Sequence, residues 1–456
     1  MPPSVNDLPL ACGNCGVLFM CKAEQPSGKS IKLAHTQRVN RESTTQDTPL
    51  ATLANRMAGL FQHQSLRAAV VYGIGGAGFS LGTLLLARYL SPADFGLLAL
   101  LIAMVQVGIG VGPAGVDLLV NRHHPPIEAG LALRVLVTSF ATSVLVTTLA
   151  GTVYGIASNL LPTLFLLITA AGVSRVGSAH FQSARRFGAS LFLFQVHNFI
   201  LLLSVPLALA FDAMEVAFIL GIIAGGHVAT AVLGWSMARQ KLQPEGSRLT
   251  QSALWREGLS GVGISIAMLL LAQTERYVIP LLLSFEDMAL FSVLAAVVIA
   301  PFRMMQGAVA FTLLPRLRTA RDGAAAIRIV RNESLLLVCV GIAASAVVIL
   351  LGRWVVSFFA GDTYKITLGL MSVAIVVGWI RLAQSVSVAT VNARGTARSL
   401  RLLNRFSWLS LGVALLAAWF LSRFGLVGII VGVGLGWLTQ TIAATLIASR
   451  IFRSPR

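Results

Sequence analysis

The chain has 456 residues, of which 56% are apolar and only 11% are charged, and its formal net charge is +18. Soluble chains are on average about a quarter charged, which excludes a soluble enzyme, a disordered protein and a secreted disulfide scaffold. The apolar residues are spread along most of the chain, so we expect the positive charge to be arranged around a bilayer and do not expect nucleic acid as a partner.

Residues 1–56 are polar and rich in Ser, Thr, Gln and Asn, which predicts a cytoplasmic tail that is disordered or lies upstream of a true start at Met57. Cys12, Cys15 and Cys21, together with His35, supply part of a zinc-ligand pattern. A closed zinc site needs a second well-spaced pair, which is missing here. We therefore expect no metal ion and no other cofactor.

After this tail, apolar runs long enough to cross a bilayer recur with short breaks. A spanning helix needs about 20 mostly apolar residues. Twelve such helices are predicted, over residues 68–90, 95–120, 131–154, 160–178, 190–211, 214–237, 259–283, 288–314, 334–351, 366–388, 406–421 and 426–447. The runs are too long and too rich in Leu for barrel strands, so the expected fold is an all-α polytopic membrane protein.

The breaks between these helices alternate in charge. The loops that follow even-numbered helices are basic, whereas the loops on the other side are acidic and hold only Arg88, Arg353, Lys365 and Arg423 as cations. The positive-inside rule therefore predicts an inner-membrane protein with both termini in the cytoplasm. A face this basic is also expected to attract anionic membrane lipids.

The second six helices repeat features of the first six. Leu90-Ser91-Pro92-Ala93-Asp94-Phe95-Gly96-Leu97 and Leu283-Ser284-Phe285-Glu286-Asp287-Met288-Ala289-Leu290 share Leu, Ser, Asp and Leu at one offset. We therefore predict an N-terminal bundle over 57–237, a cytoplasmic linker over 238–258 and a C-terminal bundle over 259–456. The two pseudo-symmetric bundles would surround a central cavity, which is the usual substrate site of a transporter.

Several segments also resemble one known family. LLLARYLSPADFGLLALL, GVDLLVNR, LLLSFEDMALFSVL and FTLLPRLR are similar to segments of the oligosaccharide (polysaccharide repeat-unit) flippases. These belong to the superfamily that also holds lipid II flippases and multidrug extruders. The resemblance implies a transporter that moves undecaprenyl-diphosphate-linked oligosaccharide across the inner membrane. It also implies a polysaccharide polymerase and glycosyltransferases as partners.

Within the helices, no arrangement of residues is typical of a catalytic site, so no enzyme activity is expected. Instead, arginines lie inside apolar segments, where insertion of each costs about 2.5–3.5 kcal/mol. The planar guanidinium makes bidentate hydrogen bonds to phosphate. The candidates for binding a lipid diphosphate are Arg276, Arg303, Arg381 and, nearer a helix end, Arg175. Each could instead be paired with an acid or reach an interface.

Two acidic residues in the helices are candidates for ion coupling. Glu275 is next to Arg276, and neighbours on a helix do not face each other, so we expect Glu275 to pair with Arg303 on another helix. Asp117 lies close to Arg122, which favours a position at the interface.

Two other functions remain open from the sequence. One is a cation-coupled extruder of drugs, whose site should favour acidic and aromatic residues. The other is a membrane scaffold that docks glycosyltransferases on its basic loops and transports nothing. The surface polysaccharide served, whether O-antigen, capsule or exopolysaccharide, is not determined by these patterns.

Overall fold

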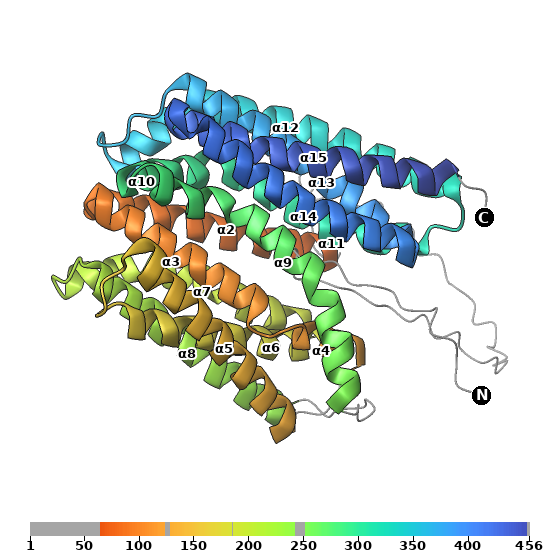
Figure 1. Ribbon diagram of the computed structural model, residues 1–456, viewed down its shortest axis with the longest axis horizontal. Coiled ribbons are helices and arrows are strands. Elements are labelled where there is room, and N and C mark those ends of the chain that lie inside the picture. The colour runs from red at the N-terminus through yellow and green to blue at the C-terminus, as the bar shows by residue number, and fades with distance from the viewer. Residues whose placement is uncertain (1–63, 124–127, 185, 242–250, 454–456) are drawn as a thin grey trace, which may run out of the picture.

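A computed structural model describes residues 64–123, 128–184, 186–241 and 251–453. The described residues form helices and no strand (Figure 1). The helices are α2 (Gln64–Tyr89), α3 (Pro92–Val111), α4 (Val116–His123), α5 (Ala129–Tyr154), α6 (Leu161–Ser183), α7 (Phe187–Ala210), α8 (Val216–Lys241), α9 (Gln251–Leu282), α10 (Phe285–Leu294), α11 (Ala300–Thr319), α12 (Gly323–Ala360), α13 (Leu368–Arg394), α14 (Ala397–Leu421) and α15 (Gly425–Arg453).

These helices confirm the predicted polytopic membrane fold. Ten segments of the described chain are long and apolar enough to cross a bilayer, and one of them, Ala397–Phe452, contains both α14 and α15. With α2, whose 26 residues are also of spanning length, the described chain accounts for the twelve predicted crossings. Large apolar side chains exposed on the outer helix faces, such as Leu350 at 77% and Leu145 at 61%, suit contact with lipid.

The charged residues gather at the two ends of the helices, as the sequence predicts. We call the end where α13 is followed by α14 the basic end, and the end where α2 is followed by α3 the acidic end (Figure 1). The basic end carries Arg186, Arg239, Arg316, Arg318, Arg321, Arg328, Arg331, Arg394, Arg398, Arg401, Arg405 and Arg450. The assignment of the basic end to the cytoplasm stays a prediction from the charge rule.

The second predicted helix, over residues 95–120, is interrupted. The chain leaves the helix after Val111, and Ala114 and Gly115 take left-handed backbone conformations with φ of 45° and 78°. Pro113 lacks the N–H that would continue the helix. As a result Asp117 lies in the first turn of a separate helix, α4.

Two helices extend well beyond their predicted apolar runs. α12 begins at Gly323, capped by the Asp322 side chain, and runs for 38 residues through a segment that contains Arg328 and Arg331. α9 begins at Gln251, so the predicted linker 238–258 is helical at both ends, and residues 242–250 lie outside the described part. In both cases good helix formers such as Ala, Arg and Glu continue the helix past the apolar boundary. The predicted tail 1–56, with its cysteines, also lies outside the described residues.

The predicted internal repeat is visible as two identical helix caps. Ser91 accepts a hydrogen bond from the Asp94 N–H at 3.2 Å, and Ser284 accepts one from the Asp287 N–H at 3.1 Å. In each cap the serine hydroxyl also donates to the aspartate carboxylate. The two caps begin α3 and α10, which pack against each other at the acidic end.

Contacts between the two groups of helices are close at this end. Arg88 at the end of α2 donates a hydrogen bond of 3.0 Å to the Phe358 carbonyl at the end of α12. The ring of Phe95 in α3 contacts the ring of Tyr364 edge-on, with 6.3 Å between centroids. The division of the chain into two bundles at a linker stays a prediction, but the acidic end is a shared contact surface of both groups.

α3 and α10 are in very close contact at Gly96, where an added Cβ would overlap the Phe285 carbonyl oxygen. We expect Gly96→Ala to destabilise the fold by about 1–3 kcal/mol, because backbone atoms cannot move aside as a flexible side chain can. Thermal unfolding of the purified protein in detergent measures the effect. Gly221→Ala, with no atom within 4 Å of its Cβ, is the matched control and should not lower the unfolding temperature. Equal stability of the two variants would contradict the close contact.

Candidate functional site

A buried ion pair joins α9 to α13. Glu275 and Arg381 have side chains only 1% and 2% exposed, and the Arg381 guanidinium donates to the Glu275 carboxylate. The same guanidinium lies over the Trp437 ring of α15, 4.8 Å from its centroid. Removing one partner of such a pair leaves an uncompensated buried charge. Glu275 therefore balances Arg381, and the predicted pairing of Glu275 with Arg303 is wrong.

Arg276, the next residue of α9, is buried without a carboxylate of its own. Its side chain is 5% exposed, and its Nη1 donates to the Gln273 Oε1 at 3.2 Å. The Nε atoms of Arg276 and of Arg381 have no hydrogen-bond partner in the described structure. A buried donor without an acceptor is costly, so both groups retain the capacity to bind an additional acceptor.

Arg303 of α11 adds a third guanidinium within electrostatic range of these charges. It is half-buried and interacts electrostatically with Arg276, Arg381 and Glu275. We call these four residues the arginine cluster. Because three guanidinium groups are opposed by a single carboxylate, the cluster carries an excess of positive charge. Three of the four arginines singled out from the sequence are thus brought together by the structure.

The arginine cluster lies close to the junction with the N-terminal helices. The Tyr277 hydroxyl, on the residue after Arg276, donates a hydrogen bond of 3.0 Å to the Ala103 carbonyl of α3. The Tyr154 hydroxyl of α5 donates one of 3.1 Å to the Tyr277 carbonyl. A movement of the N-terminal helices relative to α9 would therefore pull on Tyr277 and displace the chain next to Arg276.

The fourth candidate, Arg175 of α6, lies in the N-terminal group of helices. Its Nε donates to the Asp117 Oδ2 of α4 at 3.3 Å, and its guanidinium lies 4.8 Å from the centroid of the Phe194 ring. Arg175 is thus paired with an acid, as one interpretation of the sequence allowed. The sequence predicted an interfacial position for Asp117 from the nearby Arg122, whose side chain lies outside the described part. In the described part, Asp117 pairs with Arg175, 58 positions away.

Several polar residues near the arginine cluster were missed by the sequence interpretation. Gln273 binds Arg276 directly, and Gln384 is fully buried one turn after Arg381. Gln440, one turn after Trp437, donates to the Ser407 hydroxyl at 3.0 Å, while its Oε1 accepts no hydrogen bond in the described structure. A scan for amides three residues from an intramembrane arginine or aromatic residue would have found all three, because polar groups inside a bilayer are rare.

The described residues contain no group of three His, Cys, Asp or Glu side chains that could hold a metal ion. Three histidines of the described helices lie in the N-terminal group, with His180 and His227 buried and His197 half-buried. The rings of His197 in α7 and His227 in α8 stack with 5.9 Å between centroids, and His180 contacts Trp235 edge-on at 5.8 Å. What the arginine cluster can do chemically is bind an anion, since its surplus groups are hydrogen-bond donors with positive charge.

The fold is similar to that of several solved transporters. Superposition on the lipid II flippase MurJ gives a TM-score of 0.54 at 11% identity, over 85% of this chain and 89% of that chain. The Vibrio cholerae MATE transporter VcmN gives 0.54 at 14% identity, over 85% and 98% of the two chains. The eukaryotic MATE transporter AtDTX14 gives 0.54 at 12% identity, with the same coverage. At these identities the similarity establishes the fold alone.

At the level of sequence, no curated protein matches the chain. A family model described as polysaccharide biosynthesis protein does match, over residues 85–368. The match extends from the end of α2 to the beginning of α13 and so includes both serine caps, Arg276 and Arg303. Because this segment is more than half of the chain, the protein belongs to the polysaccharide biosynthesis protein family.

Proposed function

We propose that the protein flips undecaprenyl-diphosphate-linked oligosaccharide repeat units from the cytoplasmic to the outer leaflet of the inner membrane. The translocated units would supply a surface polysaccharide, with a polymerase and glycosyltransferases as the partners that consume and produce them. The membership of the polysaccharide biosynthesis family and the flippase-like fold support a transporter with a substrate of this class.

The observation that carries the proposal is the excess positive charge of the arginine cluster. A lipid-linked diphosphate is an anion that cannot cross hydrocarbon without compensation, because burying an isolated charge is very costly. Arg276 and Arg381 each have an Nε donor without a hydrogen-bond partner in the described structure. Among the electrostatic partners of Arg303, the acidic group is Glu275, which already pairs with Arg381. The diphosphate oxygens would accept bonds from these groups.

The same charges argue against a cationic cargo. A cation near the arginine cluster would meet three arginines and a single carboxylate that is already bonded to Arg381. At distances of a few ångströms, like charges repel each other by several kcal/mol in a partly buried setting. The structural similarity to drug extruders therefore extends to the fold and not to the chemistry proposed for this site.

Glu275 and Asp117 are the proposed coupling acids. Protonation of either carboxylate would remove its attraction for its arginine partner, Arg381 or Arg175. Arg381 released in this way would be free to bind the diphosphate, so protonation and substrate binding would be linked through one guanidinium. If protons and the diphosphate bind more tightly to one conformation of the transporter, their binding shifts the equilibrium toward that conformation.

Reconstitution into liposomes tests the proposed function. A fluorescent undecaprenyl-diphosphate oligosaccharide in the inner leaflet should become accessible to an external quencher faster than in empty liposomes. A matched undecaprenol oligosaccharide without phosphate should not be flipped.

An imposed proton gradient should accelerate flipping by the wild type but not by Glu275→Gln or Asp117→Asn. Export of a cationic dye without lipid movement would identify a drug extruder, and movement of neither would identify a scaffold.

A further inference from the structure

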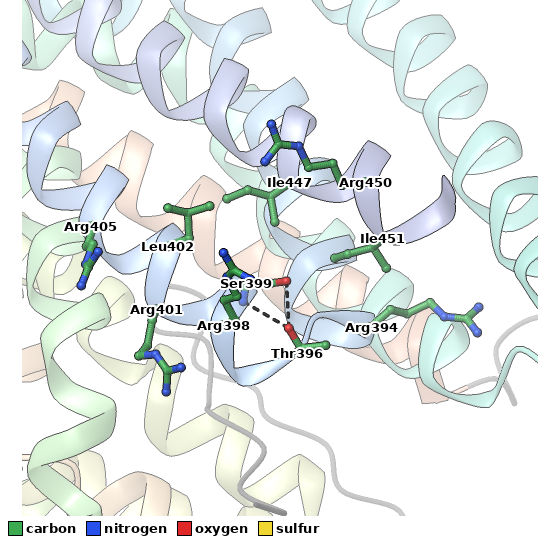
Figure 2. A pocket seen from close by; sticks show the side chains of 10 residues that line it. All are labelled: Arg394, Thr396, Arg398, Ser399, Arg401, Leu402, Arg405, Ile447, Arg450 and Ile451. Atoms are coloured by element: carbon green, nitrogen blue, oxygen red, sulfur yellow. Dashed lines mark hydrogen bonds between the residues drawn. The ribbon is translucent and has the colours of Figure 1, made fainter. Parts of the chain in front are cut away.

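A second group of arginines lines a pocket at the basic end, separate from the arginine cluster inside the helices. The pocket is about 670 Å³ in volume and lies where the end of α13, the beginning of α14 and the end of α15 meet. Figure 2 shows the Arg394 guanidinium directed away from the other arginines and apolar side chains such as Ile447 among them; five arginines line the pocket. They are Arg394, Arg398, Arg401, Arg405 and Arg450.

All the charged side chains that line this pocket are arginines. The first turn of α14 adds further positive potential, because the N-terminus of a helix carries unsatisfied N–H groups. The Thr396 hydroxyl accepts the Ser399 N–H and so fixes this turn at the edge of the pocket (Figure 2). Arg398, Arg401 and Arg405 are exposed, so their guanidinium groups are accessible to a ligand. Arg394 also donates a hydrogen bond of 3.0 Å to the Asp322 carbonyl. The exposed guanidinium groups of Arg398, Arg401 and Arg405 repel one another, and a bound anion would reduce that repulsion.

The exposed surface that continues from these arginines is strongly apolar. On α14, Arg398, Arg401 and Arg405 share one helix face with Trp408, Leu409 and Leu416, given 3.6 residues per turn. The exposed fractions of these three apolar side chains are 44%, 53% and 61%. On α15, Leu446 and Ile442 are likewise exposed one and two turns before Arg450. The pocket is therefore the polar end of an apolar face, as the headgroup of a lipid and its acyl chains would require.

We propose that this pocket binds the phosphate-bearing headgroup of an anionic phospholipid, with its acyl chains along the exposed apolar faces of α14 and α15. Basic pockets between membrane helices on the cytoplasmic side are suited to such headgroups. The exposed apolar faces beside the pocket favour a lipid over a free phosphate, because a soluble anion would gain no binding energy from Trp408 and Leu409. The proposal does not depend on which substrate the transporter moves.

Trp408 gives the experiment a local reporter. The full chain is placed in phosphatidylcholine nanodiscs that contain a small fraction of phosphatidylglycerol brominated near the carbonyl end of its acyl chains. The quenching that disappears in Trp408→Phe is the signal from this site. We expect phosphatidylglycerol to quench Trp408 well below the mole fraction at which equally brominated phosphatidylcholine does, and the difference to shrink as salt screens the charges.

The test variant replaces Arg398, Arg401 and Arg405 together by Gln. Each arginine near a membrane surface adds to the free energy of binding an anionic lipid. The loss of three should therefore weaken the preference for phosphatidylglycerol roughly a hundredfold. The matched control replaces Arg321, Arg328 and Arg331 by Gln, which removes equal charge from the same end but outside the pocket lining. The control should keep the wild-type preference, and the retention of both variants in size-exclusion chromatography shows that they fold.

Three results would overturn the proposal. One is quenching of Trp408 by both brominated lipids at the same mole fraction. Another is an equal loss of preference in the test and control variants, which would mean general attraction to a negative surface. The third is stabilisation of the wild type by inorganic pyrophosphate in neutral nanodiscs with no preference for phosphatidylglycerol, which would assign the pocket to a soluble phosphate.

Discussion

Replacing Arg276 or Arg303 by Gln is expected to reduce flipping of the lipid-linked diphosphate at least about a hundredfold. Each guanidinium would give a bidentate contact to a phosphate, and a hydrogen bond to a charged group contributes about 1.5–3 kcal/mol. The buried ion pair of Glu275 is with Arg381 and not with either of these residues, so the variants should insert and fold normally. The liposome assay measures the rate, and the amount of protein recovered in the membrane is measured beside it.

Two further variants sharpen this experiment. Arg276→Lys keeps the charge but loses the planar fork, so a partial loss is expected from it. Arg328→Gln removes an exposed arginine of the basic end and is the control that should flip at the wild-type rate. Wild-type flipping by both Arg276→Gln and Arg303→Gln would refute the assignment of the arginine cluster to the diphosphate.

Glu275→Gln is expected to destabilise the protein by about 3–5 kcal/mol, because Arg381 would keep a buried charge without its counter-ion. The effect is a lower midpoint of thermal unfolding in detergent. Glu286→Gln changes an exposed glutamate at the beginning of α10 and is the matched control, with little expected effect.

A double variant separates the ion pair from other roles of Glu275. Glu275→Gln combined with Arg381→Met removes both charges and should recover most of the lost stability, since a buried pair contributes little net free energy when both partners are replaced. The coupling energy from this cycle belongs to the pair. Additive effects of the two substitutions would show that the two side chains do not interact in solution. Flipping should be lost in the double variant even though its stability recovers, because Arg381 would be missing from the arginine cluster.

Local features of this protein were predictable from the sequence for a physical reason. Inside a bilayer each helix must satisfy its own backbone hydrogen bonds, so apolar length alone predicts where the crossings lie. The caps formed by Ser91 with Asp94 and Ser284 with Asp287 each join residues three apart, so the repeated Ser and Asp are visible in the sequence alone. The cost of an arginine in hydrocarbon likewise pointed to Arg276, Arg303 and Arg381 without any knowledge of their neighbours.

Which residues meet across helices was decided by the tertiary structure alone. Glu275 pairs with Arg381, 106 positions away, rather than with Arg303, and Asp117 pairs with Arg175, 58 positions away. The basic pocket likewise exists because the end of α15 brings Arg450 beside the beginning of α14. Helix faces that contact lipid and helix faces that contact other helices are both apolar. Hydropathy therefore does not indicate which faces pack together. The helices, their charged ends and the intramembrane arginines follow from hydropathy and local charge, whereas packing determines how those charges are paired.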